Sequence, residues 1–239
     1  MDFGTPHFNR YRRFLHASSL LLAGLFCCAN VMAVTITIVA SQKSPPDLSG
    51  AVVYLTPLFS DDSQLQSENV SPQSQAAPIA IAQENRQFTP YIQIVPAGMA
   101  VSFPNRDSVA HHVYSFSKSK SFELPLYQPG DSHTEVFDSP GLVTIGCNIH
   151  DWMLNYLLVV DTQYYGKLEK NSVEIKDLPA GDYTMSLWYP GLRPAKPISQ
   201  KVTVESADQQ LNFKVKKKLR KLRDQPSVEI SRVKRRSKY

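Results

Sequence analysis

A thiol, an imidazole and a thioether stand within seven residues of one another, at Cys147, His150 and Met153. Thiolate and thioether sulfur are soft ligands that hold Cu(I), and imidazole with thiolate also suits Cu(II). A type 1 copper centre combines these three groups with one more histidine, so that the metal lies in a trigonal plane with one long axial contact. The spacing therefore predicts a site for one copper ion that needs a second histidine from elsewhere in the chain.

Two adjacent histidines, His111 and His112, are placed to complete this set, because they follow a turn at residues 104–107 and open a predicted strand. Successive side chains of a strand point to opposite faces, so only one of the two can face the metal. The pattern of residues leaves open which one it is.

Other chemistry fits this cluster less well. Zinc favours further cysteines or a carboxylate over the thioether of Met153. A binuclear copper site needs a second cysteine, and nucleophilic catalysis by Cys147 with His150 needs an oxyanion hole and an orienting acid that the sequence does not offer. Four protein ligands also leave no open position on the metal, whereas catalytic metals usually keep one. We therefore expect no enzymatic activity.

Residues 1–33 have the basic start, the apolar run and the small-residue exit of a secretory signal peptide, cleaved after Ala33. Cleavage would remove Cys27 and Cys28 and leave Cys147 as the one thiol of an exported, periplasmic protein, in a compartment that favours disulfides. A metal ligand explains such a thiol better than an inert buried cysteine does, since coordination shields the sulfur. No later segment approaches the roughly 20 apolar residues of a transmembrane helix.

Charge is divided unevenly along the chain, whose formal net charge is +5. Residues 214–239 hold twelve Lys and Arg against two acidic residues, whereas residues 34–213 carry a net charge of −7. The basic tail is either a solvated, disordered segment or a contact for an anionic membrane surface or an acidic redox partner. Nucleic acid is not an expected partner of an exported protein.

Short β-branched and aromatic runs recur between turns rich in Gly, Pro and Asn, and they predict an all-β fold. One group of runs lies between residues 91 and 160. Others lie at residues 34–55 and 172–204. Residues 60–83 are rich in Ser, Gln, Asn and Pro and have no apolar period, which is typical of a linker.

Residues 88–161 resemble the cupredoxins, the plastocyanin and amicyanin group. Val101–Asp107, His111 and Cys147–Met153 carry the resemblance, and the Cys-x-x-His-x-x-Met spacing is amicyanin-like. The resemblance implies a Greek-key β-sandwich in which His111, Cys147, His150 and Met153 bind copper. Together with His111–Phe116, the same loop also resembles a family of exported proteins labelled methylamine utilization proteins.

The chain departs from the simple cupredoxins at His112, where that group usually has an asparagine that braces the cysteine loop. By the resemblance we expect His111 to be the ligand, with His112 and Asn105 as bracing residues or alternative ligands. The loop histidine of a cupredoxin reaches the surface through an apolar rim where redox partners dock. Trp152 is therefore a candidate docking residue.

Residues 178–183 resemble the Leu-Pro-x-Gly-x-Tyr segment of the carboxypeptidase-regulatory-like, transthyretin-like sandwiches, whose opening strands are similar to residues 34–55 here. This second resemblance implies that the copper domain is inserted into a small β-sandwich; the alternative is three parts in series. The expected organisation is a signal peptide (1–33), a carboxypeptidase-regulatory-like sandwich (34–59 and 162–215), a polar linker (60–85), a cupredoxin domain (86–161) and a basic tail (216–239).

Three functions are compatible with this sequence. The first is a periplasmic one-electron carrier that serves an unidentified redox protein. The second is a copper-binding module for trafficking or sensing. The third is a structural envelope protein whose copper site is vestigial.

Overall fold

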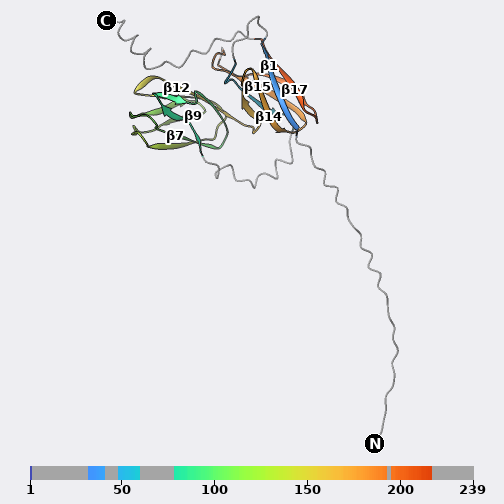
Figure 1. Cartoon of the computed structure of the whole chain (residues 1–239), viewed down its shortest axis with the longest axis horizontal. Helices are drawn as coiled ribbons and strands as arrows, with labels where there is room; N and C mark the ends of the chain where they lie inside the picture. Colours follow the sequence, from blue (N-terminus) through green and yellow to red (C-terminus); the bar gives the residue numbers. More distant parts are fainter. Residues whose placement is uncertain (2–31, 41–47, 60–77, 193–194, 217–239) are drawn as a thin grey trace. The chain divides into compact units, whose positions relative to one another are not determined.

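The computed structural model describes residue 1 and residues 32–40, 48–59, 78–192 and 195–216. Nearly all of the predicted signal peptide and of the basic tail, and most of the predicted linker, lie outside these ranges. Every regular element within them is a β-strand, which confirms the expected all-β class (Figure 1). A search of the same residues finds no helix of the length and apolarity that a membrane crossing requires.

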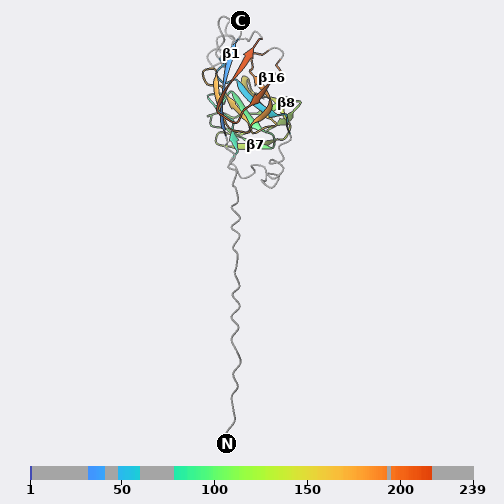
Figure 2. The ribbon, with the colours of Figure 1, turned by 90° about the vertical axis from the view of Figure 1, so that its right-hand side faces the viewer.

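Two sheets and a hairpin build the first β-sandwich. One sheet has the strand order β6-β12-β11-β8-β9, the other has the order β10-β7-β3, and β4 pairs with β5. Figure 2 shows β7 and β8 from the side. The bounds are β3 Ile79–Ala80, β4 Ala82–Glu84, β5 Gln87–Thr89, β6 Ile92–Pro96, β7 Met99–Pro104, β8 Val113–Ser117, β9 Lys120–Glu123, β10 Ser132–Phe137, β11 Gly141–Cys147 and β12 His150–Val160.

Strict alternation along these strands builds the core between the two sheets, because every second side chain of a strand points to the same face. On β7 the side chains of Met99, Val101 and Phe103 are buried, and the residues between them are half-buried. On β11 the same period turns Val143, Ile145 and Cys147 inward. The thiol therefore lies in an apolar core because it shares a strand face with two aliphatic residues.

Two further sheets build the second β-sandwich, with strand orders β14-β1-β17 and β13-β2-β15-β16. β1 runs parallel to β17 and antiparallel to β14, and β2 runs antiparallel to both β13 and β15. Strands that precede the first sandwich in the chain thus share both sheets with strands that follow it. The bounds are β1 Met32–Ala40, β2 Val52–Pro57, β13 Tyr165–Lys167, β14 Ser172–Leu178, β15 Gly181–Trp188, β16 Ile198–Val204 and β17 Gln209–Val215.

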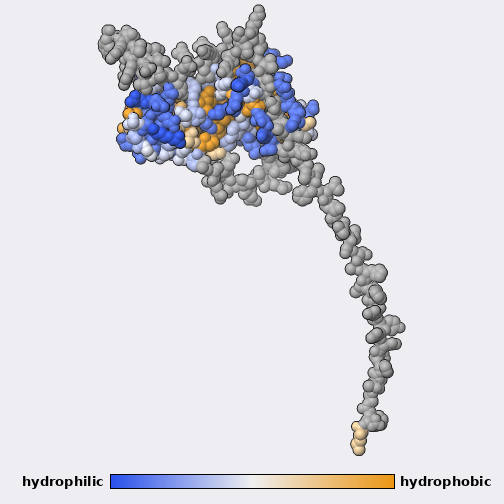
Figure 3. All heavy atoms as spheres, in the orientation of Figure 1, coloured by the Kyte–Doolittle hydropathy of each residue, from blue (hydrophilic) through white to orange (hydrophobic). Residues whose placement is uncertain are grey.

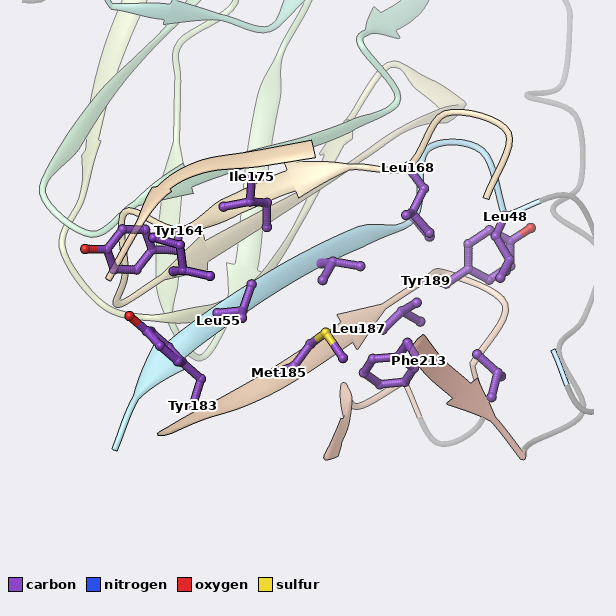
Figure 4. Close-up of a cluster of buried hydrophobic side chains, with 14 of the residues drawn as sticks. Leu48, Leu55, Tyr164, Leu168, Ile175, Tyr183, Met185, Leu187, Tyr189 and Phe213 are labelled. Atoms are coloured by element: carbon purple, nitrogen blue, oxygen red, sulfur yellow. The ribbon is translucent and has the colours of Figure 1, made fainter. Parts of the chain in front are cut away.

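The core of the second sandwich contains large side chains from β2, β15 and β17 (Figure 4). Tyr183, Met185 and Leu187 point inward from β15 and are fully buried. Leu55 of β2 and Phe213 of β17 pack in the same cluster. Because buried side chains of this size each contribute about 1.5–3 kcal/mol, this cluster accounts for a large share of the sandwich's stability.

A third apolar cluster joins the two sandwiches, which belong to one compact unit. β6 and β12 turn one face toward the core of the first sandwich, and Ile92 and Leu158 lie on the other face. Trp188, which ends β15, is fully buried against this second face. Lys167 donates a hydrogen bond from Nζ to the carbonyl of Ile92 at 3.1 Å. Strand β12 is therefore packed on both faces along its second half.

Replacement of Trp188 by alanine should lower the free energy of unfolding by about 3–5 kcal/mol, because it empties a fully buried site between the sandwiches. The indole Nε1 has no hydrogen-bond partner among the described residues, so Trp188→Phe should cost much less. Urea unfolding of the three proteins measures both effects. Equal losses for the two variants would contradict this role.

Hydrophilic residues cover most of the described surface in the view of Figure 3. A few large apolar side chains of the first sandwich are nevertheless exposed: Phe116, Leu126, Val136 and Ile149. Ile149 lies in the turn between β11 and β12, next to the predicted ligand His150. It is half exposed, with 50% of its surface accessible.

Candidate metal centre

Cys147 and His150 lie at the two ends of a tight hairpin. Cys147 is the last residue of β11, His150 is the first of β12, and the two are paired across the turn. The register of the two strands shifts between Gly146 and Cys147. The predicted ligand loop is therefore part of a β-hairpin whose strands hold both donors in place.

Three donor atoms converge at this end of the first sandwich. The Sγ of Cys147 lies 3.7 Å from Nδ1 of His111 and 3.6 Å from Nδ1 of His150. All three donors lie within 4.8 Å of one another, and the two imidazole rings have centroids 4.9 Å apart. Cys147 and His111 are buried, and His150 is partly exposed.

These separations fit a shared metal ion. Nitrogen and sulfur ligands bind such ions at about 2.0–2.3 Å, so two of them at a trigonal angle lie roughly 3.5–4 Å apart. The separations of Sγ from both Nδ1 atoms fall in that range. Two imidazoles with a thiolate in a trigonal arrangement are the donor set of a type 1 copper centre.

His111 is held from its ring and from its backbone. Its Nε2 lies 2.8 Å from Oδ2 of Asp107, a carboxylate that only accepts hydrogen bonds when ionised, so the Nε2–H donates. This tautomer leaves Nδ1 free for a metal. The backbone N–H of His111 donates to the carbonyl of Tyr127, and the N–H of Tyr127 donates back. Both the orientation of the ring and the position of the chain are thereby fixed.

Both histidines are biased toward the neutral form that can bind a metal. Burial lowers the pKa of His111, although the hydrogen bond and charge of Asp107 oppose this effect. Burial also lowers the pKa of His150, with further lowering by His111 and by the charge of Arg86. Burial, followed by the charge of Cys147, raises the pKa of the Tyr127 hydroxyl, which keeps that group protonated.

His112 lies outside the donor cluster. Its Nε2 lies 2.9 Å from Oε1 of Glu123, and its Nδ1 lies 3.2 Å from the side-chain amide nitrogen of Asn148. The structure thus separates two histidines that are adjacent in the sequence. β8 begins only at Val113, so the pair lies just before the strand, and His111 forms an isolated bridge with Tyr127.

Asn105 is buried and braces the turn that leads to His111. Its side-chain amide donates to the carbonyls of Val109 and Tyr127, and its Oδ1 accepts from the N–H of Asp107. It thereby fixes the carboxylate that holds His111. The bracing of a metal ligand by Asn105 stays a prediction.

Met153 and Trp152 follow His150 on β12, and both pack in or against the core cluster that contains Cys147. Met153 is buried in the same core cluster as Cys147, which places the thioether on the inner face. Trp152 is half-buried, its ring centroid lies 5.3 Å from that of His150, and its Nε1 donates to the carbonyl of Arg86 at 3.0 Å. Trp152 therefore has a structural contact in addition to the docking role expected from the sequence.

Two residues that contact the site were missing from the sequence prediction, Asp107 and Tyr127. Asp107 lies four residues before His111, and this short spacing is a signal that could have identified it. Tyr127 lies farther along the chain and reaches the site through long-range contacts, among them the pairing of its backbone with His111. No local pattern marks it.

No family model and no curated protein matches the chain. Among solved structures, a purple cupredoxin from Nitrosopumilus maritimus is 28% identical and matches 35% of this chain and 99% of its own, with a TM-score of 0.31. A Cu(I) form of an amicyanin variant is 17% identical over 35% of this chain and 83% of its own, with a TM-score of 0.33.

A copper-containing nitrite reductase from Thermus scotoductus is 22% identical over 36% of this chain, with a TM-score of 0.35. This chain spans only 23% of that enzyme. Each likeness covers little more than a third of the chain, so the donor atoms described above carry the functional conclusion.

Proposed function

We propose that this protein is a one-electron carrier with a single type 1 copper ion, bound in a cupredoxin domain formed by the first sandwich. The convergence of the two Nδ1 atoms of His111 and His150 on the Sγ of Cys147 carries this proposal. Met153, buried beside them, is the proposed axial ligand. A copper ion held by these four side chains would exchange single electrons between its two oxidation states.

The protein's own part is to hold four donors in one geometry for both oxidation states. Asp107 fixes the tautomer and the ring orientation of His111, and hydrogen bonds of this kind tune a metal's ligands. The β11–β12 hairpin sets the separation of Cys147 from His150. Because the donors are already assembled by the fold, little rearrangement is needed when an electron moves.

The partly exposed edge of His150 is the proposed path for the electron. Ile149, half exposed in the same hairpin turn, and Trp152, whose ring lies beside His150, would form an apolar contact for a redox protein. Apolar patches rimmed by polar residues are typical of such contacts.

The wider setting of the site is also a proposal. The signal-peptide pattern supports export to the periplasm, and the basic tail would attach the acidic body to an anionic membrane surface or an acidic partner. The pairing of β1 with β17 and of β2 with β15 supports insertion of the copper domain into a sandwich of residues 34–59 and 162–215.

The test is voltammetry and absorption of the copper-loaded protein with the variant Met153→Leu. We expect a reversible one-electron wave and an intense visible band in both proteins, because thiolate and imidazoles remain. The variant's potential should rise by roughly the 59 mV that corresponds to a tenfold change for one electron, since Cu(II) loses a donor.

Two other results would contradict an electron carrier. Transfer of Cu(I) to an apo-acceptor protein without a reversible wave would favour a trafficking module. Failure to retain any metal after loading would favour a structural role with a vestigial site.

A further inference from the structure

The β4–β5 hairpin approaches both histidines of the site. Ala82 pairs with Thr89 and Glu84 with Gln87, so the turn consists of Asn85 and Arg86 alone. Both turn residues have positive φ, 53° and 55°. A two-residue turn of this kind fits the twist of a hairpin, although residues other than glycine adopt it at some cost. The turn therefore has one defined shape, which presents the backbone of Arg86 to its neighbours.

The N–H of Arg86 contacts the carboxylate that is hydrogen-bonded to the first histidine, His111. It donates to Oδ2 of Asp107 at 2.9 Å, and the same oxygen lies 2.8 Å from Nε2 of His111. Asp107 is largely buried, with 10% of its side chain exposed, and His111 is fully buried. The hairpin thus fixes the carboxylate that fixes the ring.

The carbonyl of Arg86 contacts the indole that packs beside the second histidine, His150. It accepts the Nε1–H of Trp152 at 3.0 Å, and the Trp152 ring packs beside the ring of His150 with centroids 5.3 Å apart. The two backbone polar groups of Arg86 therefore bind Asp107, which contacts His111, and Trp152, which contacts His150.

A second contact of the hairpin lies deeper. Gln83 is fully buried on β4, and its Oε1 accepts the hydroxyl hydrogen of Tyr127 at 2.5 Å. Tyr127 is the residue whose backbone pairs with His111 in both directions. The carbonyl of Gln83 also accepts the N–H of Arg106, next to Asp107. The hairpin thereby supports the backbone of the first histidine as well as its ring.

We propose that the β4–β5 hairpin, residues 82–89, is a positioning element of the metal site. In this element the backbone of Arg86 holds the rings of His111 and His150 in a fixed position relative to each other. The functional role of this hairpin depends on the copper site proposed above. The hold on the two rings is a property of the metal-free protein and can be tested separately.

The test compares two substitutions at one position. Arg86→Pro removes the N–H that Asp107 accepts, and it excludes the positive φ of the turn, because the proline ring fixes φ near −65°. Arg86→Gly removes only the guanidinium and keeps both backbone groups in a conformation that glycine adopts readily. Lys170→Pro is the control, since Lys170 also has a positive φ, in a turn of the second sandwich.

Three measurements are made on each variant. Nitrogen-edited NMR of the imidazole rings in the metal-free protein reports the His111 Nε2–H and the order of both rings. Competition with a chromophoric chelator gives the affinity for Cu(I). Thermal unfolding shows whether each variant is folded.

We expect Arg86→Pro to broaden or shift the ring signals of both His111 and His150 and to weaken Cu(I) binding about 10- to 100-fold, the usual effect of losing an outer contact of a metal ligand. Arg86→Gly should keep the native ring signals at a pH at which both imidazoles are neutral, and Lys170→Pro should keep both the native signals and the affinity. A folded Arg86→Pro variant with native signals would overturn the proposal, and so would an Arg86→Gly variant with the same defect, because the charge would then be the cause.

If Arg86→Pro does not fold, Trp152→Phe tests the same proposal. It removes the indole N–H that the carbonyl of Arg86 accepts, together with part of the ring, and keeps a smaller aromatic side chain at the position beside His150. The ring signals of His150 should change while those of His111 stay native. Unchanged His150 signals would overturn the proposal. If the unsubstituted protein binds no copper while the ring signals of the variants change as expected, the proposed function is refuted and the positioning role of the hairpin stands.

Discussion

Cys147→Ser is expected to abolish the intense visible band of the copper-loaded protein. The band arises from charge transfer between a thiolate and Cu(II), and Cys147 is the free cysteine of the described residues. Its Sγ lies 3.6–3.7 Å from both histidine donors, so no other soft anion can take its place in the cluster. Absorption spectra of the two proteins after copper loading, with copper content measured in parallel, make the comparison.

Val143→Ala provides the matched control for this loss. Val143 lies on the same inward face of β11 as Cys147, and its truncation leaves a cavity in the same core without removing a donor. It should lower the free energy of unfolding and keep the band. A band that persists in Cys147→Ser would refute the site, and a band lost equally in both variants would show that it depends on core packing alone.

His111→Ala should abolish the visible band and weaken copper binding by more than the roughly 10- to 100-fold effect of losing an outer contact, because it removes a ligand. It also leaves the buried carboxylate of Asp107 without the ring that contacts it at 2.8 Å. Cu(I) competition and absorption measure the loss.

The adjacent variant His112→Ala should keep the band. His112 pairs with Glu123, whose side chain is 61% exposed, and such pairs contribute at most about 1 kcal/mol to the free energy of unfolding. The two substitutions lie at adjacent positions, and the visible band is expected to be lost in one variant and kept in the other. Loss of the band in His112→Ala with retention in His111→Ala would reverse the assignment.

The inward direction of Cys147 could be predicted from sequence because it depends on a local rule. Cys147 is two and four residues from Ile145 and Val143, and a strand places such residues on one face. The choice between His111 and His112 could not be made by the same rule. Both lie before β8 begins, and the backbone bridge from His111 to Tyr127 sets their directions.

The end of the predicted linker shows a second limit. Residues 79–84 belong to a stretch whose polar composition predicted no regular structure, yet they form β3 and β4. Ile81 and Gln83 are fully buried there. The free-energy cost of burying the polar side chain of Gln83 is offset because its Oε1 accepts a hydrogen bond from the Tyr127 hydroxyl. A polar side chain that is satisfied by a distant partner cannot be distinguished from a solvated one by composition.

The sequence by itself determined the donor types, the spacing of Cys147, His150 and Met153, and the all-β class, because all of these depend on residues a few positions apart. The tertiary structure decided the rest. It brought His111 to a thiol 36 residues away, turned His112 toward Glu123, and set Arg86 against the supports of both histidines. Contacts over such separations depend on how whole strands pair, and strand pairing is a property of the assembled sheets.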